Sequence, residues 1–408
     1  MQQELPLRGK KFVFIGGGSE SVPGILEARL MGADVMVLDA NAQCDGARMA
    51  DHFVKCPIEM PAETDAIVSR EFGGFIPDVV TSVGTDFPET VALLTARFET
   101  IGVPVDSAVI SSSKIRQKSF LQGIKVPTAF GAVVQSLHDG FQRFEEFGRR
   151  AIVKPVDSRG SRGVFLPSNR GQFEACFEAA QLVSPSGTVI VEEFMKGPQL
   201  SSESLVVDGI CHTLGLSLRN YRTTRQFLPA VLEDGGDLTP TTFEDYHYAV
   251  DELLQPVVTA LGVNQGSIKG DLVITKSGLK IVEFALRPSG GYFCSHQIPA
   301  ATSVNFLAEL FLNLAGRPES VPQLKVASHK HVSQRFILPT SGVQPASLKT
   351  PTWAEPNSSV IAFDLATRPK TVAGPLNHSS RRGSVITRPD GEVTSVCLAE
   401  RFILEASS

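Results

Sequence analysis

The chain has 408 residues, of which 42% are hydrophobic and 20% charged, and its net charge is −5. This length exceeds the usual range of a single hydrophobic core, so we expect several subdomains. The sequence has no basic stripe and no apolar run of about 18 residues, which argues against a nucleic-acid partner and against a membrane span. Because the segment 1–11 also lacks the apolar core of a signal peptide, we expect a cytoplasmic protein.

The six cysteines are widely spaced and form no CxxC pattern, which argues against a zinc site and against a disulfide framework. We expect them to be buried as small apolar residues. They are Cys44, Cys56, Cys176, Cys211, Cys294 and Cys397.

Residues 1–113 alternate short apolar strands with helices. We predict strands at 12–15, 35–38 and 78–83, and helices at 22–31, 63–72 and 87–101. Such alternation is typical of a parallel sheet with helices on both faces. The predicted fold class is therefore α/β and α+β, beginning with a doubly wound parallel-sheet domain.

The glycine-rich end of the first strand marks the edge of this sheet where a ligand would bind. Gly16 to Gly18 follow the strand, but the dinucleotide-binding spacing GxGxxG is incomplete because Ser21 occupies its last position. Ligands of such sheets bind at the carboxyl ends of strands, so Gly17, Gly18 and Asp86 are candidate substrate residues. For each residue alone, an ordinary turn without a ligand is an equally good interpretation.

Residues 114–197 form a second, α+β module. Serines 111–113 can cap a helix that begins at Lys114, and strands are expected at 130–134, 151–154, 164–166 and 188–194, with helices at 137–148 and 172–182. Lys154 ends a strand and precedes the Gly- and Ser-rich loop 157–163. Such a loop suits polyphosphate, because backbone N–H groups can surround the oxygens while the ammonium supplies charge. The alternative is a simple turn between strands.

Residues 198–326 contain a hairpin with opposed acids. If the turn is Lys276-Ser277-Gly278, Thr275 pairs with Leu279, and counting outward places Asp271 opposite Glu283. The apolar face is then Leu272, Ile274, Val282, Phe284 and Leu286, and the polar face is Lys269, Asp271, Glu283 and Arg287.

Opposed carboxylates repel each other, so a fold that keeps them usually supplies a cation, and oxygen ligands suit Mg²⁺ or Mn²⁺ held together with phosphates. The alternative is a solvent-facing hairpin with two unrelated acids.

Beyond these residues, 327–408 read as a β-rich terminal subdomain, with strands expected at 332–338, 360–365 and 384–387.

Taken in order, these segments resemble the ATP-grasp superfamily, in the branch that contains biotin carboxylase, purine carboxylases and L-amino-acid ligases. The resemblance implies a pre-ATP-grasp domain at 1–113, a mobile lid subdomain at 114–197, a metal-bearing core at 198–326 and a β-rich subdomain at 327–408. It also implies ATP with Mg²⁺ or Mn²⁺ as cofactors.

The resemblance assigns roles residue by residue. Contacts to ATP fall on Lys114 and Lys154, on Ser158, Gly160, Ser161 and Gly163 of the loop, on Glu192, Glu193, Phe194 and Met195 at the adenine, and on Gln199 at the ribose. Metal ligands fall on Asp271 and Glu283, and the catalytic pair is Arg287 with Lys154. Ser289, Gly290 and Gly291 would line the substrate site. Two positions depart from the family pattern, with Gln199 in place of Glu and Ala285 in place of Asn.

The function implied is an ATP-dependent ligase that joins a small-molecule carboxylate to an amine through an acyl phosphate, in a monomer or a homodimer. A bicarbonate-phosphorylating carboxylase and a nucleotide-binding protein without turnover are alternatives. A nicotinamide-dependent oxidoreductase that uses Gly16 to Gly18 is a third.

Overall fold

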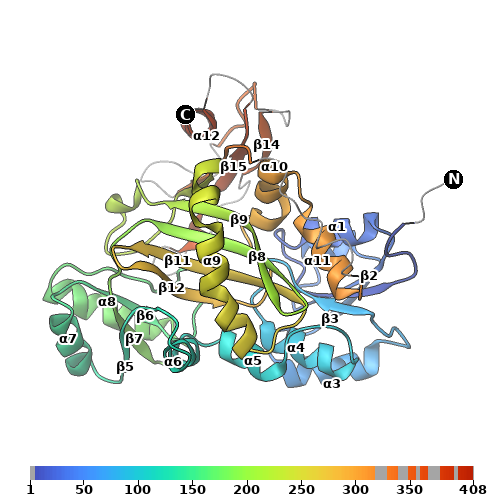
Figure 1. Ribbon diagram of the computed structural model, residues 1–408, viewed down its shortest axis with the longest axis horizontal. Coiled ribbons are helices and arrows are strands. Elements are labelled where there is room, and N and C mark those ends of the chain that lie inside the picture. The colour runs from blue at the N-terminus through green and yellow to red at the C-terminus, as the bar shows by residue number, and fades with distance from the viewer. Residues whose placement is uncertain are drawn as a thin grey trace.

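Three sheets organise the residues that the computed structural model describes, which are 5–317, 329–338, 348–354, 359–365, 377–389 and 394–407. Figure 1 shows the N-terminal sheet on one side of the largest sheet and the 114–197 module on the other, with the long helix α9 (Pro240–Ala260) across the largest sheet. No described helix combines the length and the apolar composition that crossing a membrane requires.

The N-terminal sheet is parallel, with the strand order β3-β2-β1-β4. Phe12 and Phe14 pack into one hydrophobic core, whereas Val13 and Ile15 pack into another, so both faces are covered and the doubly wound prediction is confirmed. Its elements are β1 (Lys11–Ile15), α1 (Val22–Leu30), β2 (Asp34–Asp39), α2 (Asp45–Met49), β3 (His52–Lys55), α3 (Pro61–Glu71), β4 (Val79–Thr81), α4 (Pro88–Arg97) and α5 (Val105–Ser111).

Two local predictions for this domain were wrong. The helix expected at 87–101 spans only Pro88–Arg97. Strand β3 was not predicted, because its four residues lie at the sheet edge and none of their side chains is buried, which leaves no apolar run to detect.

The second sheet is antiparallel, with the order β5-β7-β6, and it is covered by two helices. Its elements are α6 (Lys114–Gly123), β5 (Gly131–Val134), α7 (Leu137–Glu146), β6 (Ala151–Pro155), α8 (Arg170–Leu182) and β7 (Val189–Glu193). The strand predicted at 164–166 is wrong: only Phe165 makes bridges, to Val153 and Ala230. Pro167 follows and has no N–H with which to continue a ladder.

The largest sheet runs β12-β11-β8-β9-β10-β13-β15-β14, and all its neighbours are antiparallel. Helix α9 packs on one face, where Val250, Leu254 and Val257 meet apolar side chains of the strands. The opposite face is apolar where Leu205, Val207 and Leu214 pack against α11, and it carries the acidic residues Asp271 and Glu283 at β11 and β12. The strands are β8 (Gln199–Val207), β9 (Ile210–Asn220), β10 (Gly235–Leu238), β11 (Gly266–Thr275), β12 (Gly278–Ala285), β13 (Val332–Ile337), β14 (Val360–Leu365) and β15 (Gly383–Thr387).

The remaining elements connect the sheets. Helix α11 (Phe306–Leu314) shares a core with Phe12 and Phe14 of the N-terminal sheet. The others are the 3-10 helices η1 (Thr224–Gln226) and η5 (His378–Ser380), the π-helix η2 (Phe293–Gln297), α10 (Ile298–Thr302) and α12 (Ser395–Ala406). Five cysteines are buried as predicted, but Cys397 is exposed, because the face of α12 that packs inward carries Ala399 and Phe402 instead.

The β11–β12 hairpin places Asp271 opposite Glu283, as predicted, but through a different turn. The ladder closes at Thr275 and Gly278, so the turn has two residues, 276 and 277, and the predicted three-residue turn is wrong. A two-residue turn alone would put every later pair out of the predicted register by one position.

A bulge on β12 compensates for this difference. Leu272 pairs with Ile281 and Asp271 pairs with Glu283, so Val282 is the extra residue without a ladder partner. Ile281 is fully buried in the core beneath α9. The prediction that Val282 belongs to the apolar face was therefore wrong, and Ile281 takes its place.

Candidate functional site

The acidic pair of the hairpin, Asp271 and Glu283, stands directly opposed on neighbouring strands of the largest sheet. Lys269 Nζ lies 2.8 Å from Asp271 Oδ2, and Arg219 Nη2 lies 2.6 Å from Asp271 Oδ1. Burial raises the pKa of Asp271, but the charges of Arg219 and Lys269 outweigh it and hold that pKa well below its usual range. With a side chain only 13% exposed, Asp271 is a buried, ionised carboxylate and not part of a solvent-facing hairpin.

Arg219 on β9 organises this end of the site. Its other guanidinium nitrogens reach Glu233 Oε2 at 2.6 Å and Ser201 Oγ at 2.7 Å. No local pattern in the sequence singles out Arg219. The structure assigns Arg219 a definite place between two carboxylates on the buried polar face.

The donors at this hairpin fit a divalent cation that is shared with phosphates. In the described part of the chain no cluster of three or more His, Cys, Asp or Glu side chains could hold a metal alone. Asp271 and Glu283 supply carboxylate oxygens only, and Mg²⁺ typically takes one or two carboxylates and completes its shell with phosphates and water. Ionised Asp271 is the protonation state that such binding needs.

Two buried lysines share one carboxylate in the 114–197 module. Lys154 Nζ of β6 lies 2.8 Å from Glu192 Oε2, and Lys118 Nζ of α6 lies 3.1 Å from Glu192 Oε1. Burial lowers the pKa of Lys154, but Glu192 and then Glu283 raise it above its usual value. Lys154 is thus a fixed ammonium within the field of the acidic pair. No local pattern in the sequence assigns Lys118 a role.

Lys114 and the loop 158–163 lie next to these lysines. Lys114 Nζ donates to the Ser158 carbonyl at 2.6 Å, and burial lowers the pKa of Lys114. Gly160, Ser161 and Gly163 all have left-handed backbone angles, with φ of 62°, 58° and 73°. These positive φ values mark tight backbone turns within the loop, which glycine adopts without steric cost.

The predicted adenine segment follows β7. The Phe194 amide donates to the Arg150 carbonyl at 3.0 Å, and the Arg150 guanidinium lies over the Phe194 ring at 5.2 Å. Glu193 accepts a hydrogen bond from the Phe130 amide, and Met195 is half-buried. At the predicted ribose position, Gln199 Oε1 accepts a hydrogen bond from the buried hydroxyl of Tyr221.

Arg287 meets the N-terminal domain at the end of the hairpin. Its Nε lies 3.0 Å from Asp86 Oδ1, and Arg159 of loop 158–163 lies 3.4 Å from Asp86 Oδ2. Burial raises the pKa of Asp86, but Arg287 and Arg159 bring it below its usual value. Asp86 is thus an ionised carboxylate. It forms an ion pair with Arg287, whose guanidinium was predicted to hold a substrate carboxylate.

The loop after Arg287 is fixed from beneath by Glu203 of β8. The Ser289 amide donates to Glu203 Oε2 at 3.0 Å, and the Ser289 hydroxyl donates to the same oxygen. The Gly291 carbonyl accepts from Gln334 at 2.9 Å. Gly290 leaves room for Glu20, whose carboxylate oxygen would lie 2.1 Å from a Cβ at position 290. The sequence singled out neither Glu203 nor Glu20.

The two glycines predicted to face a substrate, Gly17 and Gly18, follow the first strand and differ in how much open space borders them. The Gly17 amide already donates to Asp39 at 2.8 Å, and the Gly17 carbonyl accepts from Gly46. Nothing lies within 4 Å of a Cβ built on Gly18, so Gly18 borders open space. Of these two, Gly18 is the better placed to face a ligand.

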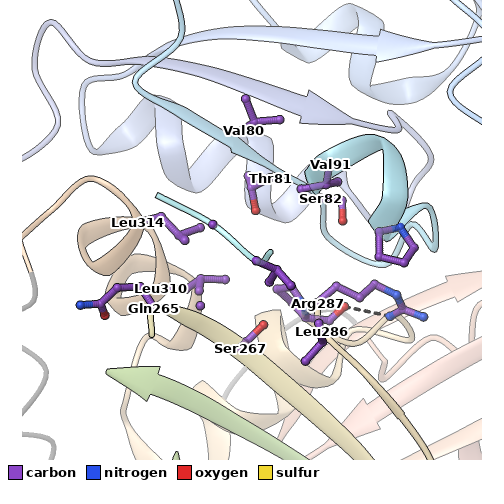
Figure 2. Close-up of a pocket in the computed structure, with 15 residues that line it drawn as sticks. Val80, Thr81, Ser82, Val91, Gln265, Ser267, Leu286, Arg287, Leu310 and Leu314 are labelled. Carbon is purple, nitrogen blue, oxygen red and sulfur yellow. Dashed lines mark hydrogen bonds between the residues drawn. The ribbon is translucent and has the colours of Figure 1, made fainter. Parts of the chain in front are cut away.

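A cavity of about 40 Å³ lies where the N-terminal domain meets β11 and α11, and Arg287 is one of its lining residues (Figure 2). It is too small for a nucleotide. Its labelled lining residues are Val80, Thr81, Ser82, Val91, Gln265, Ser267, Leu286, Arg287, Leu310 and Leu314.

Glu203 gives a stability prediction. Burial raises its pKa from 4.5 to about 7, so the folded chain keeps this proton over a range in which the unfolded chain releases it. The contribution of Glu203 to the free energy of unfolding therefore falls as pH rises from about 4.5 to 7. The free energy of unfolding of Glu203→Gln, relative to that of the parent, should therefore rise by up to about 3 kcal/mol between pH 4.5 and pH 8. Urea unfolding at both pH values measures this gain, and the exposed Glu178→Gln is the control that should show none.

Comparison with known proteins identifies similar sequences and similar structures. Residues 112–290 match the family model described as the phosphoribosylglycinamide synthetase ATP-grasp (A) domain. A phosphoribosylamine–glycine ligase from Leifsonia xyli subsp. xyli is 28% identical over 207 residues, which cover 46% of this chain and 47% of that relative. The chain thus spans about half the length of the curated relatives it matches.

Solved structures match over nearly the whole chain. The L-amino acid ligase from Bacillus licheniformis aligns with a TM-score of 0.77 at 20% identity, covering 98% of both chains. N5-carboxyaminoimidazole synthetase from Staphylococcus aureus, complexed with ADP, aligns with a TM-score of 0.72 at 15% identity, covering 98% of this chain and 99% of that one. The resemblance to the ATP-grasp superfamily and the predicted fold class are confirmed.

Proposed function

We propose that this chain, which has the ATP-grasp fold, is an ATP-dependent ligase that activates a carboxylate as an acyl phosphate and couples it to an amine. One observation carries the proposal. The acids Asp271 and Glu283 are opposed on one hairpin, their charges raise the pKa of Lys154, and Arg287 stands four residues beyond Glu283 at the end of the same hairpin. A triphosphate and a carboxylate can therefore meet at one place.

ATP is the proposed nucleotide. Lys154, Lys114 and loop 158–163 supply cations and backbone N–H groups for its phosphates. Gln199 can bind the ribose hydroxyls. The adenine lies at 193–195 in this proposal. The ADP complex of the Staphylococcus aureus protein supports an adenine nucleotide as the ligand. Asp271 and Glu283 would hold Mg²⁺ or Mn²⁺, which when bound neutralises phosphate charge.

The chain's own residues then act in two steps. Arg287 binds the substrate carboxylate in place of Asp86, and a carboxylate oxygen forms a bond to the γ-phosphorus while the bond to ADP breaks. The amine nitrogen next attacks the acyl carbon, phosphate leaves, and the amine proton passes to phosphate or solvent. Arg287 faces the oxyanion of that adduct, and loop 158–163 excludes water from the acyl phosphate.

A bicarbonate-phosphorylating carboxylase is the second candidate, because a carboxylase-type purine enzyme shares the fold. Ala285, two residues after Glu283, favours the amine ligase. Many members of the superfamily that this chain resembles carry Asn there, whereas its amino-acid ligases lack it. Small-molecule carboxylates and amines of the cytoplasm are the proposed substrates.

A screen for ADP release over pairs of carboxylates and amines, with bicarbonate as one carboxylate, tests the proposal. We expect ADP only when both substrates are present, together with a product whose mass equals their sum less one water. ADP released with bicarbonate alone would favour the carboxylase. Binding of ATP without ADP from any pair would leave a nucleotide-binding protein.

A further inference from the structure

A histidine from the C-terminal part of the chain holds loop 158–163. His378 Nε2 lies 2.9 Å from the Ser161 hydroxyl oxygen, and the His378 amide donates to the Gly160 carbonyl at 3.1 Å. More than two hundred residues separate these partners in the sequence. The two bonds join backbone and side chain of the loop to the 3-10 helix η5.

The surroundings of His378 keep its imidazole neutral. Burial and then the nearby charge of Arg381 lower the pKa of His378 well below its usual value, and the charges of Arg219, Lys269 and Asp271 act on it as well. A neutral ring can bind the Ser161 hydroxyl without adding charge next to a triphosphate.

The loop needs such support. Ser161 has φ of 58°, a left-handed conformation that costs energy for any residue with a Cβ and persists only where neighbours hold it. At the other end of the loop, Arg159 pairs with Asp86 and lies over the Phe87 ring at 4.7 Å. The loop is thus fixed to the N-terminal domain by Arg159 and to the C-terminal part by His378.

We propose that His378 is a positioning residue that fixes loop 158–163 over the nucleotide, so that the C-terminal part of the chain completes the ATP site. This inference rests on the proposed function only in taking 158–163 as the loop that covers the phosphates. His378 acts through Ser161 and Gly160 and not on the reacting atoms.

The test compares His378→Phe, which keeps a flat ring without nitrogen, with His378→Gln, whose amide can restore the bond to Ser161. We expect His378→Phe to weaken binding of a non-hydrolysable ATP analogue roughly three- to tenfold, the loss of one hydrogen bond. It should also speed trypsin cleavage at Arg159 and Arg162 in the analogue-bound chain. His378→Gln should stay near the parent, with an unchanged melting temperature.

The exposed His138→Phe on α7 is the matched control and should change neither readout. If His378→Phe fails to fold, Ser161→Ala breaks the same bond from the half-exposed loop side. Analogue affinity and cleavage within twofold of the parent in the folded variant would overturn the proposal. Neither readout requires turnover, so a failure of the ligase proposal, seen as no ADP from any substrate pair, remains distinguishable from a failure of this one.

Discussion

Glu283→Gln is expected to lower ADP formation by roughly two to three orders of magnitude or more, while the chain remains folded. The amide keeps the size of the side chain but removes one of the two charged oxygen groups opposed at the hairpin. Because the acids repel each other without a cation, the variant should unfold at the same temperature as the parent or slightly higher.

The measurement is ADP release at saturating substrates, with titration of Mg²⁺ in the presence of an ATP analogue. Glu244→Gln makes the same chemical change on the exposed side of α9, which covers the opposite face of this sheet, and should leave activity unchanged. Activity within tenfold of the parent in Glu283→Gln would refute the metal assignment.

Arg287→Ala should lower turnover by roughly two to three orders of magnitude and change the affinity for an ATP analogue by less than about threefold. The guanidinium pairs with Asp86 and contacts none of the lysines assigned to the phosphates. Removing it deletes the group that would hold the carboxylate and its oxyanion. Arg287→Lys should recover only part of the rate, because an ammonium cannot bind a carboxylate in two places.

The turnover rate and the affinity for the ATP analogue are measured on the same preparations. Arg97→Ala is the control, because Arg97 forms a comparable pair with Asp65 on the surface of the N-terminal domain. An equal loss of turnover and of analogue affinity in Arg287→Ala would contradict a role at the acyl group.

The sequence predicted the parts of the site that depend on local pattern. Alternation across one hairpin was enough to oppose Asp271 and Glu283, although two errors, in the turn and at the bulge, cancelled. A bulge depends on how the strand packs beneath α9. There Ile281, and not Val282, lies in the hydrophobic core. The two-residue alternation of apolar and polar side chains along a strand does not reveal such packing.

Residues that act through distant contacts were beyond the sequence. Arg219 reaches Asp271 over 52 positions, and Lys118 reaches Glu192 between two elements whose approach no local pattern specifies. Glu203 looked like one more polar residue in a strand, yet its carboxylate is fully buried beneath Ser289. The signal that could have found Glu203 is its place on the same face as Lys269, its partner in the ladder.

The eight strands of the largest sheet make residues 112–290 inseparable from the residues that follow them. A chain cut after β12 would expose the whole hydrogen-bonding edge of β10, which β13 covers. Free edges of this kind recruit other chains. An isolated 112–290 fragment should therefore precipitate on expression, and any exchange of this domain between relatives has to carry the C-terminal strands with it.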